Sequence, residues 1–128
     1  HLNKNLKIYG GFVGTETMLS QRDWETNSTI LSGDFSGNDT VSGSGSSLVI
    51  TNNGENAYHV FITTGLNSTT LIDGFTVKGG NADGSGNISY AGSSFSRDSG
   101  GGMVNDYSSP SISNTIFSGN AAALVFKN

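Results

Sequence analysis

The chain of 128 residues contains no cysteine, a single proline and few charged residues, which make up 12% of it. Without cysteine, disulfide bonds have no part in its stability. The formal net charge is −4 and the pI is about 4.8, and no stripe of basic residues occurs. Nucleic acids and anionic membranes are therefore not expected as partners. No apolar run is long enough to predict a signal segment or membrane insertion.

Helix-forming patterns are also scarce. Helical spacing occurs in residues 17–24, where we expect one short turn that covers the N-terminal side of the core. Gly, Ser, Asn and Thr make up about half of the chain, a composition that is also found in disordered proteins. Here, however, short apolar packets recur between the polar turns and predict strands. These packets are KIYGGF, TIL, SLVIT, YHVFIT, LIDGFTV, TIF and LVF.

An internal repeat indicates how the strands are arranged. Residues 103–105 return in similar form as residues 126–128, so Asn105 and Asn128 are expected to stack. Segments 71–80 and 112–120 also share a form, in which inward apolar residues precede a glycine corner. Strand-and-turn units of about 20 to 25 residues become stable when they stack on copies of themselves. We therefore predict an all-β parallel β-helix of about five to six coils, with residues 1–128 as one segment, rather than a β-sandwich.

The sequence pattern distinguishes a loop that should leave the stack from residues that should fill its core. Residues 81–99 lack a period and should leave the stack as a loop insertion. Tyr90 and Phe95 could pack this loop down or contact a ligand, and packing is favoured; with Arg97 they are candidates for a ligand-binding loop surface. The residues expected to point inward are Ile30, Val60, Ile62, Ile72, Phe75, Val77, Ile112 and Phe117.

Six segments occur in a characteristic order and cover most of residues 6–128. They are IYGGFVGTET, SQRDW, TILSGD, NAYHV, DGFTV and the block that runs from GGGMVN to SSPSISNTIFSGNAA. In these segments the chain resembles the right-handed parallel β-helix proteins that Bacteroidetes and related bacteria secrete. The resemblance implies a right-handed coil, an extracellular or cell-surface location and a piece of a longer protein. Such proteins include adhesins, polysaccharide-degrading enzymes and structural surface proteins, so the resemblance does not select an activity.

The expected function is that of a structural and adhesive segment of a secreted cell-surface protein, which could build an extracellular filament. Ends that fall inside the repeat would leave strand edges unpaired and apolar residues such as Ile8, Phe12, Leu124 and Phe126 exposed. The expected partners are therefore neighbouring coils of the same protein, a second copy stacked head to tail, or surface glycans.

Two alternative functions make different demands on the sequence. A polysaccharide-degrading enzyme would need Asp73, Asp98 or Asp106 to converge with Arg97 or Lys78. An ice-binding module would need flat ranks of outward threonines, and the pairs at residues 63–64 and 69–70 are too irregular.

His59, in an alternating strand, is assigned a structural place, because no serine or cysteine near it has a nucleophile's context. No catalytic residue is assigned.

Calcium is the one cofactor for which the sequence offers candidate ligands. Asp34, Ser36, Asn38 and Asp39 alternate oxygen-bearing side chains with glycine, as loops for hard cations do, and residues 81–87 do so as well. Neither loop completes an EF-hand, and a polar turn is the simpler interpretation of both. Asp39 and Val41 flank Thr40 in a triplet that resembles the O-glycosylation signal of Bacteroidetes, which makes Thr40 a candidate for a sugar.

Overall fold

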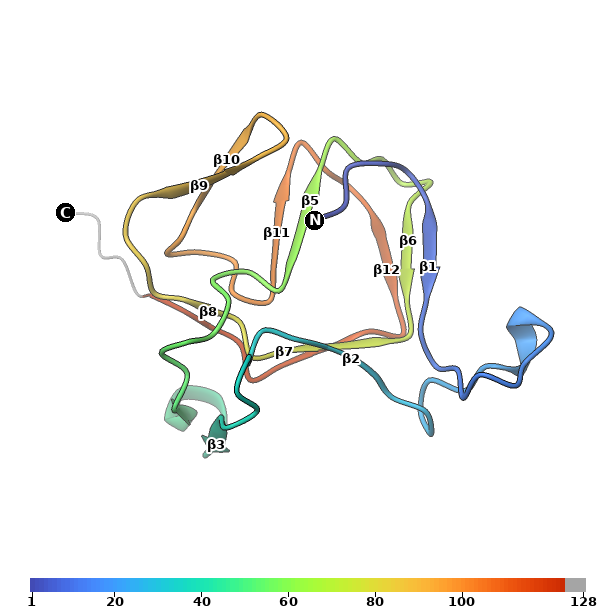
Figure 1. The fold of residues 1–128 in the computed structure, drawn as a ribbon, viewed down its shortest axis with the longest axis horizontal. Helices are drawn as coiled ribbons and strands as arrows, with labels where there is room; N and C mark the ends of the chain where they lie inside the picture. Colours follow the sequence, from blue (N-terminus) through green and yellow to red (C-terminus); the bar gives the residue numbers. More distant parts are fainter. Residues whose placement is uncertain (124–128) are drawn as a thin grey trace.

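The computed structural model describes residues 1–123, which contain short strands, turns and two single-turn 3-10 helices. No α-helix occurs in this range, as the composition predicts. The turn expected near residues 17–24 is the 3-10 helix η1 (Leu19–Gln21). It buries no residue and projects away from the stacked strands, so the prediction that it covers the core is wrong (Figure 1). Predictions for Leu124, Phe126 and Asn128 lie outside the described residues.

Two three-stranded parallel sheets organise the fold. The first consists of β1 (Lys7–Tyr9), β6 (Leu71–Asp73) and β12 (Ser111–Ser113), in the order β1-β6-β12. The second consists of β2 (Thr29–Ser32), β7 (Phe75–Lys78) and β13 (Ile116–Ser118), with β7 in the middle. In the first sheet Ile8, Ile72 and Ile112 are register partners, and in the second Leu31, Val77 and Phe117 are. The expected equivalence of segments 71–80 and 112–120 is thereby confirmed.

Two further parallel pairs complete each turn of the chain. They join β5 (Phe61–Thr64) to β11 (Met103–Asp106), and β8 (Asn81–Ala82) to β14 (Ala121–Ala122). The chain thus runs through β5, β6, β7 and β8, and then through β11, β12, β13 and β14 directly beside them (Figure 1). This winding is solenoid-like. Asn105 in β11 lies beside Thr63, whose hydroxyl donates a hydrogen bond to Asn105 Oδ1.

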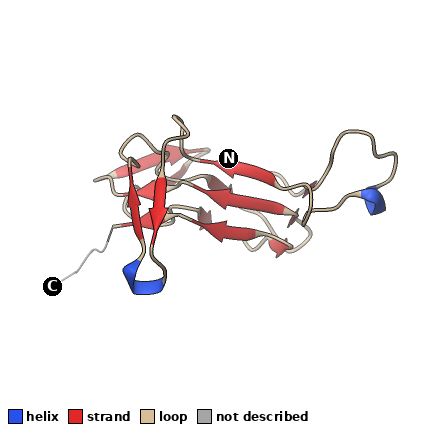
Figure 2. Ribbon diagram, turned by 90° about the horizontal axis from the view of Figure 1, so that it is seen from below, coloured by secondary structure: helices blue, strands red, loops and turns tan. Residues whose placement is uncertain are grey.

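The described stack has three levels rather than the five to six coils predicted. Ile8 and Ile72 are register partners although 64 residues separate them, and Ile72 and Ile112 are 40 residues apart. The prediction failed because long excursions interrupt the coils, and because one coil uses several apolar packets. These excursions cover residues 11–28, residues 34–56 and residues 83–100 (Figures 1 and 2).

The predicted loop insertion at residues 81–99 starts later than expected and contains regular structure. Asn81 and Ala82 are buried and form β8 inside the stack, so the excursion starts after them. Beyond them, β9 (Asn87–Tyr90) and β10 (Ser93–Ser96) pair as an antiparallel hairpin. Alternating small polar residues concealed this hairpin, because its strands carry few of the apolar residues that mark the other strands.

Glycine allows the levels to approach each other closely at the corners. A Cβ atom on Gly80 would lie 1.9 Å from the carbonyl oxygen of Gly101 on the next level, and one on Gly10 would lie 2.2 Å from the carbonyl oxygen of Gly74. Any larger residue at these corners would force the backbones of neighbouring levels apart.

The core lies between the sheets and is filled mainly from the middle level. Of the predicted inward residues, Ile62, Ile72, Phe75 and Val77 are buried and Val60 is half-buried. Ile112 and Phe117 occupy the predicted register but are exposed, because no described coil lies beyond them. The prediction that Ile30 points inward is wrong. Ile30 pairs with Thr76 on the outer face of the sheet, and Leu31 points inward instead.

Candidate functional site

The most distinctive excursion is an arm that we define as residues 34–56. It contains β3 (Thr40–Ser42), the 3-10 helix η2 (Gly45–Ser47) and β4 (Val49–Thr51), with β3 and β4 paired antiparallel. Figure 2 shows the arm running across the direction of the stacked strands, with η2 at its tip. A Cβ atom on Gly119 would lie 3.5 Å from Val41, so the arm reaches from its origin beside β2 to the level of β13.

The arm begins with a loop that Asp34 organises. Its Oδ1 accepts hydrogen bonds from the backbone N–H groups of Gly37 (2.6 Å) and Asn38 (3.2 Å), and its Oδ2 accepts one from Asp39 (3.1 Å). Desolvation opposes ionisation of this carboxyl, but the backbone N–H groups outweigh it and lower the pKa of Asp34. Of the four residues predicted to bind calcium, Asn38 and Asp39 are thus brought to Asp34 through their backbone N–H groups. Ser36 is exposed.

Asp39 and Asn56 meet where the arm leaves and rejoins the stack. The side-chain amide of Asn56 donates a 2.8 Å hydrogen bond to Asp39 Oδ2. The second carboxylate oxygen of Asp39, Oδ1, and the amide oxygen of Asn56, Oδ1, are buried and have no hydrogen-bond partner within the described part of the chain. Sequence reasoning missed Asn56, because 17 residues and a hairpin separate it from Asp39.

A surface cleft of about 550 Å³ lies between the arm and the outer face of the β2-β7-β13 sheet. The polar residues Ser32, Lys78 and Ser118, which are register partners, line it from the sheet. The other side chains that line the cleft are those of Ile30, Val41, Asp34 and Asp39.

Thr40, the predicted glycosylation site, is exposed at the start of β3.

The hairpin residues that were candidates for ligand contact divide into two groups. Phe95 is 3% exposed and its ring lies 6.5 Å from that of His59, so it packs the hairpin onto the stack. Arg97 also holds the hairpin, since its guanidinium lies 5.4 Å from the ring centre of Tyr58. Tyr90 is exposed and stacks on His1, with ring centroids 5.7 Å apart.

His59 is buried against the hairpin and lies two residues before β5 in sequence, rather than in a strand as expected. Its Nδ1 lies 3.2 Å from the carbonyl oxygen of Gly100, and its Nε2 has no partner in residues 1–123.

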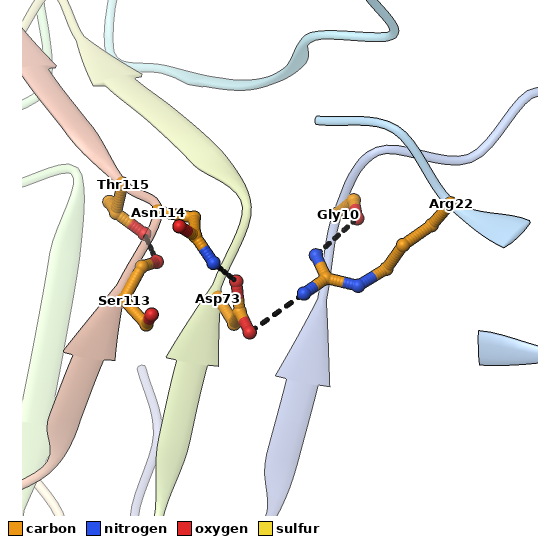
Figure 3. A network of polar contacts seen from close by, with 6 residues as sticks. All are labelled: Gly10, Arg22, Asp73, Ser113, Asn114 and Thr115. Atoms are coloured by element: carbon orange, nitrogen blue, oxygen red, sulfur yellow. Dashed lines mark hydrogen bonds and ion pairs between the residues drawn. The ribbon is translucent and has the colours of Figure 1, made fainter. Parts of the chain in front are cut away.

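A polar network lies at the corner where the chain passes from the first three-stranded sheet to the second (Figure 3). Arg22 forms a 2.7 Å ion pair with Asp73 Oδ2 and donates a 3.2 Å hydrogen bond to the carbonyl oxygen of Gly10. Asn114 donates a 2.9 Å hydrogen bond to Asp73 Oδ1. The guanidinium of Arg22 also lies over the rings of Tyr9 and Trp24, 5.2 and 4.7 Å from their centres. Both oxygens of Asp73 are therefore engaged in holding the corner.

Two of the three acidic residues of the hydrolase alternative, Asp73 and Asp98, have separate side-chain partners. Asp73 binds Arg22 and Asn114, Asp98 accepts a hydrogen bond from Ser96, and Asp106 lies at the end of β11. Within residues 1–123 no group of three or more His, Cys, Asp or Glu side chains could hold a metal ion. Among the same residues, no helix is long and apolar enough to cross a membrane.

Comparison of the chain with protein-family models, with curated proteins and with solved structures found no match.

Proposed function

We propose that this chain is a structural segment of a right-handed parallel β-helix on the surface of a bacterium, and that its end coils bind further coils. The stacked parallel sheets support the solenoid part of the proposal. The handedness, the extracellular location and the bacterial source rest on the sequence resemblance.

One observation carries the proposal. Ile112 and Phe117 have the same register as Ile72 and Val77, yet they are 43% and 44% exposed, whereas the latter two are 2% exposed. Within the described residues, β12 and β13 each pair along one edge. A strand edge with free N–H and C=O groups beside apolar side chains is a template for another strand. The level formed by β12 and β13 therefore presents an acceptor surface for one more coil.

The opposite end of the stack has a matching surface. β1 and β12 pair with β6 from opposite sides in a single register, so the β1 strand of a second copy would continue the ladder beyond β12. Ile8 of that copy would then lie on Ile112, and its Leu31 would lie on Phe117. Both Ile8 and Leu31 are half-buried in the single chain. Contacts of this head-to-tail kind do not close, and they produce filaments.

Sedimentation analysis over a range of concentrations tests this proposal with two adjacent variants. We expect the wild-type chain to associate as its concentration rises. Phe117→Lys should abolish association, because it places a charge on the inward apolar rank. Ile116→Lys, on the outward face of the same strand, is the matched control and should leave association unchanged. A wild-type monomer at all concentrations, or equal effects of the two variants, would contradict the proposal.

The cleft beside the arm favours a second candidate function, the binding of surface polysaccharide. Its volume of about 550 Å³ lies within the range of small-molecule sites. The rank of Ser32, Lys78 and Ser118 offers hydroxyl and ammonium groups next to the apolar side chain of Ile30. Affinity electrophoresis against soluble polysaccharides should show retardation that Lys78→Ala weakens and Lys4→Ala, at an exposed site outside the cleft, does not. Equal retardation of the two variants would exclude the cleft.

A further inference from the structure

The base of the arm contains two oxygen atoms whose bonding is incomplete. Asp39 directly precedes β3, and Asn56 follows the turn after β4, so this pair closes the arm where it joins the stack. The hydrogen bond from Asn56 Nδ2 to Asp39 Oδ2 holds the two side chains together. It also fixes the orientation of the amide, because turning it would place Asn56 Oδ1 against a carboxylate oxygen.

The remaining atoms, Asp39 Oδ1 and Asn56 Oδ1, are both acceptors. Both are buried, neither receives a hydrogen bond from residues 1–123, and Asn56 as a whole is only 9% exposed. A buried acceptor without a donor is destabilising, and a buried carboxylate oxygen more so. Each of these two oxygens therefore calls for a hydrogen-bond donor or a cation.

Charge near the pair favours a cation in that place. Asp34 and Asp39 line the same cleft, and neither forms an ion pair within the described residues, where Arg22 and Asp73 form the one that is present. Lys78 lines the cleft as well but makes no ion pair with either carboxylate.

We infer that Asp39 and Asn56 bind a hard divalent cation of the calcium type, which locks the base of the arm to the stack. Carboxylate and amide oxygens are ligands that calcium prefers, and calcium tolerates the irregular geometry of loops better than magnesium does. Water molecules would complete the coordination. This site differs from the set predicted from the sequence, because Asp34 serves to organise the loop and Asn56 joins Asp39 instead. The inference does not depend on the proposed function.

Calorimetric titration of the full chain, stripped of divalent ions with a chelator, tests the inference. We expect one calcium ion to bind per chain with a Kd of about 0.1 to 1 mM, as in extracellular calcium modules, and magnesium to bind more weakly. Calcium should also slow chymotrypsin cleavage at Phe35 and Leu48, because both residues lie in the arm. A wild-type chain that neither binds calcium at about 10 mM nor gains protection would overturn the inference and assign the two oxygens to water.

Two variants and a control locate the site. Asp39→Asn and Asn56→Ala should each weaken calcium binding at least about tenfold. Asp83→Asn, an equal loss of charge at an exposed position outside the cleft, should leave it unchanged. Unchanged binding in Asp39→Asn would overturn the inference. The wild-type titration decides the matter even where a variant does not fold.

Discussion

The corner network in Figure 3 allows a quantitative test of what stabilises the corner between the sheets. The side chains of Arg22 and Asp73 are 9% and 10% exposed, and their charged atoms are 2.7 Å apart. Removing one partner of a buried ion pair typically costs about 3 to 5 kcal/mol, because the other charge is left without compensation. In Asp73→Ala, Arg22 would keep its hydrogen bond to Gly10 and its contacts with two aromatic rings. We therefore expect a loss of about 3 kcal/mol, at the lower end of that range.

Urea unfolding followed by far-ultraviolet circular dichroism measures this loss, and a double-mutant cycle isolates the pair. Arg22→Met should destabilise the chain by a similar amount, and the double variant should be more stable than the sum of the two losses by about 2 kcal/mol. Asp83→Ala, at an exposed aspartate, should change the free energy of unfolding by less than about 0.5 kcal/mol. Losses that simply add, or a loss below about 1 kcal/mol in Asp73→Ala, would refute the reasoning.

Three further predictions concern the levels of the stack and the base of the arm. Ile72→Ala should cost about 2 to 5 kcal/mol, and Ile112→Ala, measured at low protein concentration, less than half as much because Ile112 is exposed; equal losses would contradict the assigned levels. Gly80→Ala should cost about 1 to 3 kcal/mol or more in urea unfolding, whereas Gly54→Ala, with nothing near its added methyl group, should be neutral or slightly stabilising. Because the pKa of Asp34 is lowered in the folded chain, its stabilising effect is present above the usual value of 3.8 and is lost as pH falls through the folded-state value. An NMR titration should therefore place the midpoint of Asp34 below 3.8, and a midpoint at or above that value would show that its backbone contacts do not form.

The stacked part of the fold could be predicted because its signals are local. Inward apolar residues alternate with outward polar ones, and glycine follows at the corner, so the relation between Val77 and Phe117 could be found before their pairing was known. Burial at the ends could not be predicted in the same way. Whether Ile112 is covered depends on a neighbouring coil, and its own alternation is the same in either case.

The arm and the polar pairs depend on long-range contacts that no local pattern marks. The packet SLVIT has the alternation of any strand, so the sequence does not distinguish β4 in the arm from a strand of the stack. Asp73 was named as a candidate for a hydrolase site, whereas the structure pairs it with Arg22, which lies 51 residues away. Asn56 completes the base of the arm only because the hairpin returns beside Asp39.

Cross-linking between copies tests the central claim, the head-to-tail addition of coils, most directly. The natural chain has no cysteine, so an introduced pair reports on a single contact. Lys7 and Ser111 pair with Leu71 from opposite sides, which places them two strand spacings apart, about 9.6 Å, in one chain and beyond the reach of a disulfide. In stacked copies, Ser111 of one chain would lie beside Lys7 of the next. Mild oxidation of the variant Lys7→Cys/Ser111→Cys should therefore give a ladder of covalent dimers, trimers and longer species. Monomer alone, or the same ladder from Lys7→Cys/Ile116→Cys, whose positions lie in different sheets, would contradict the account.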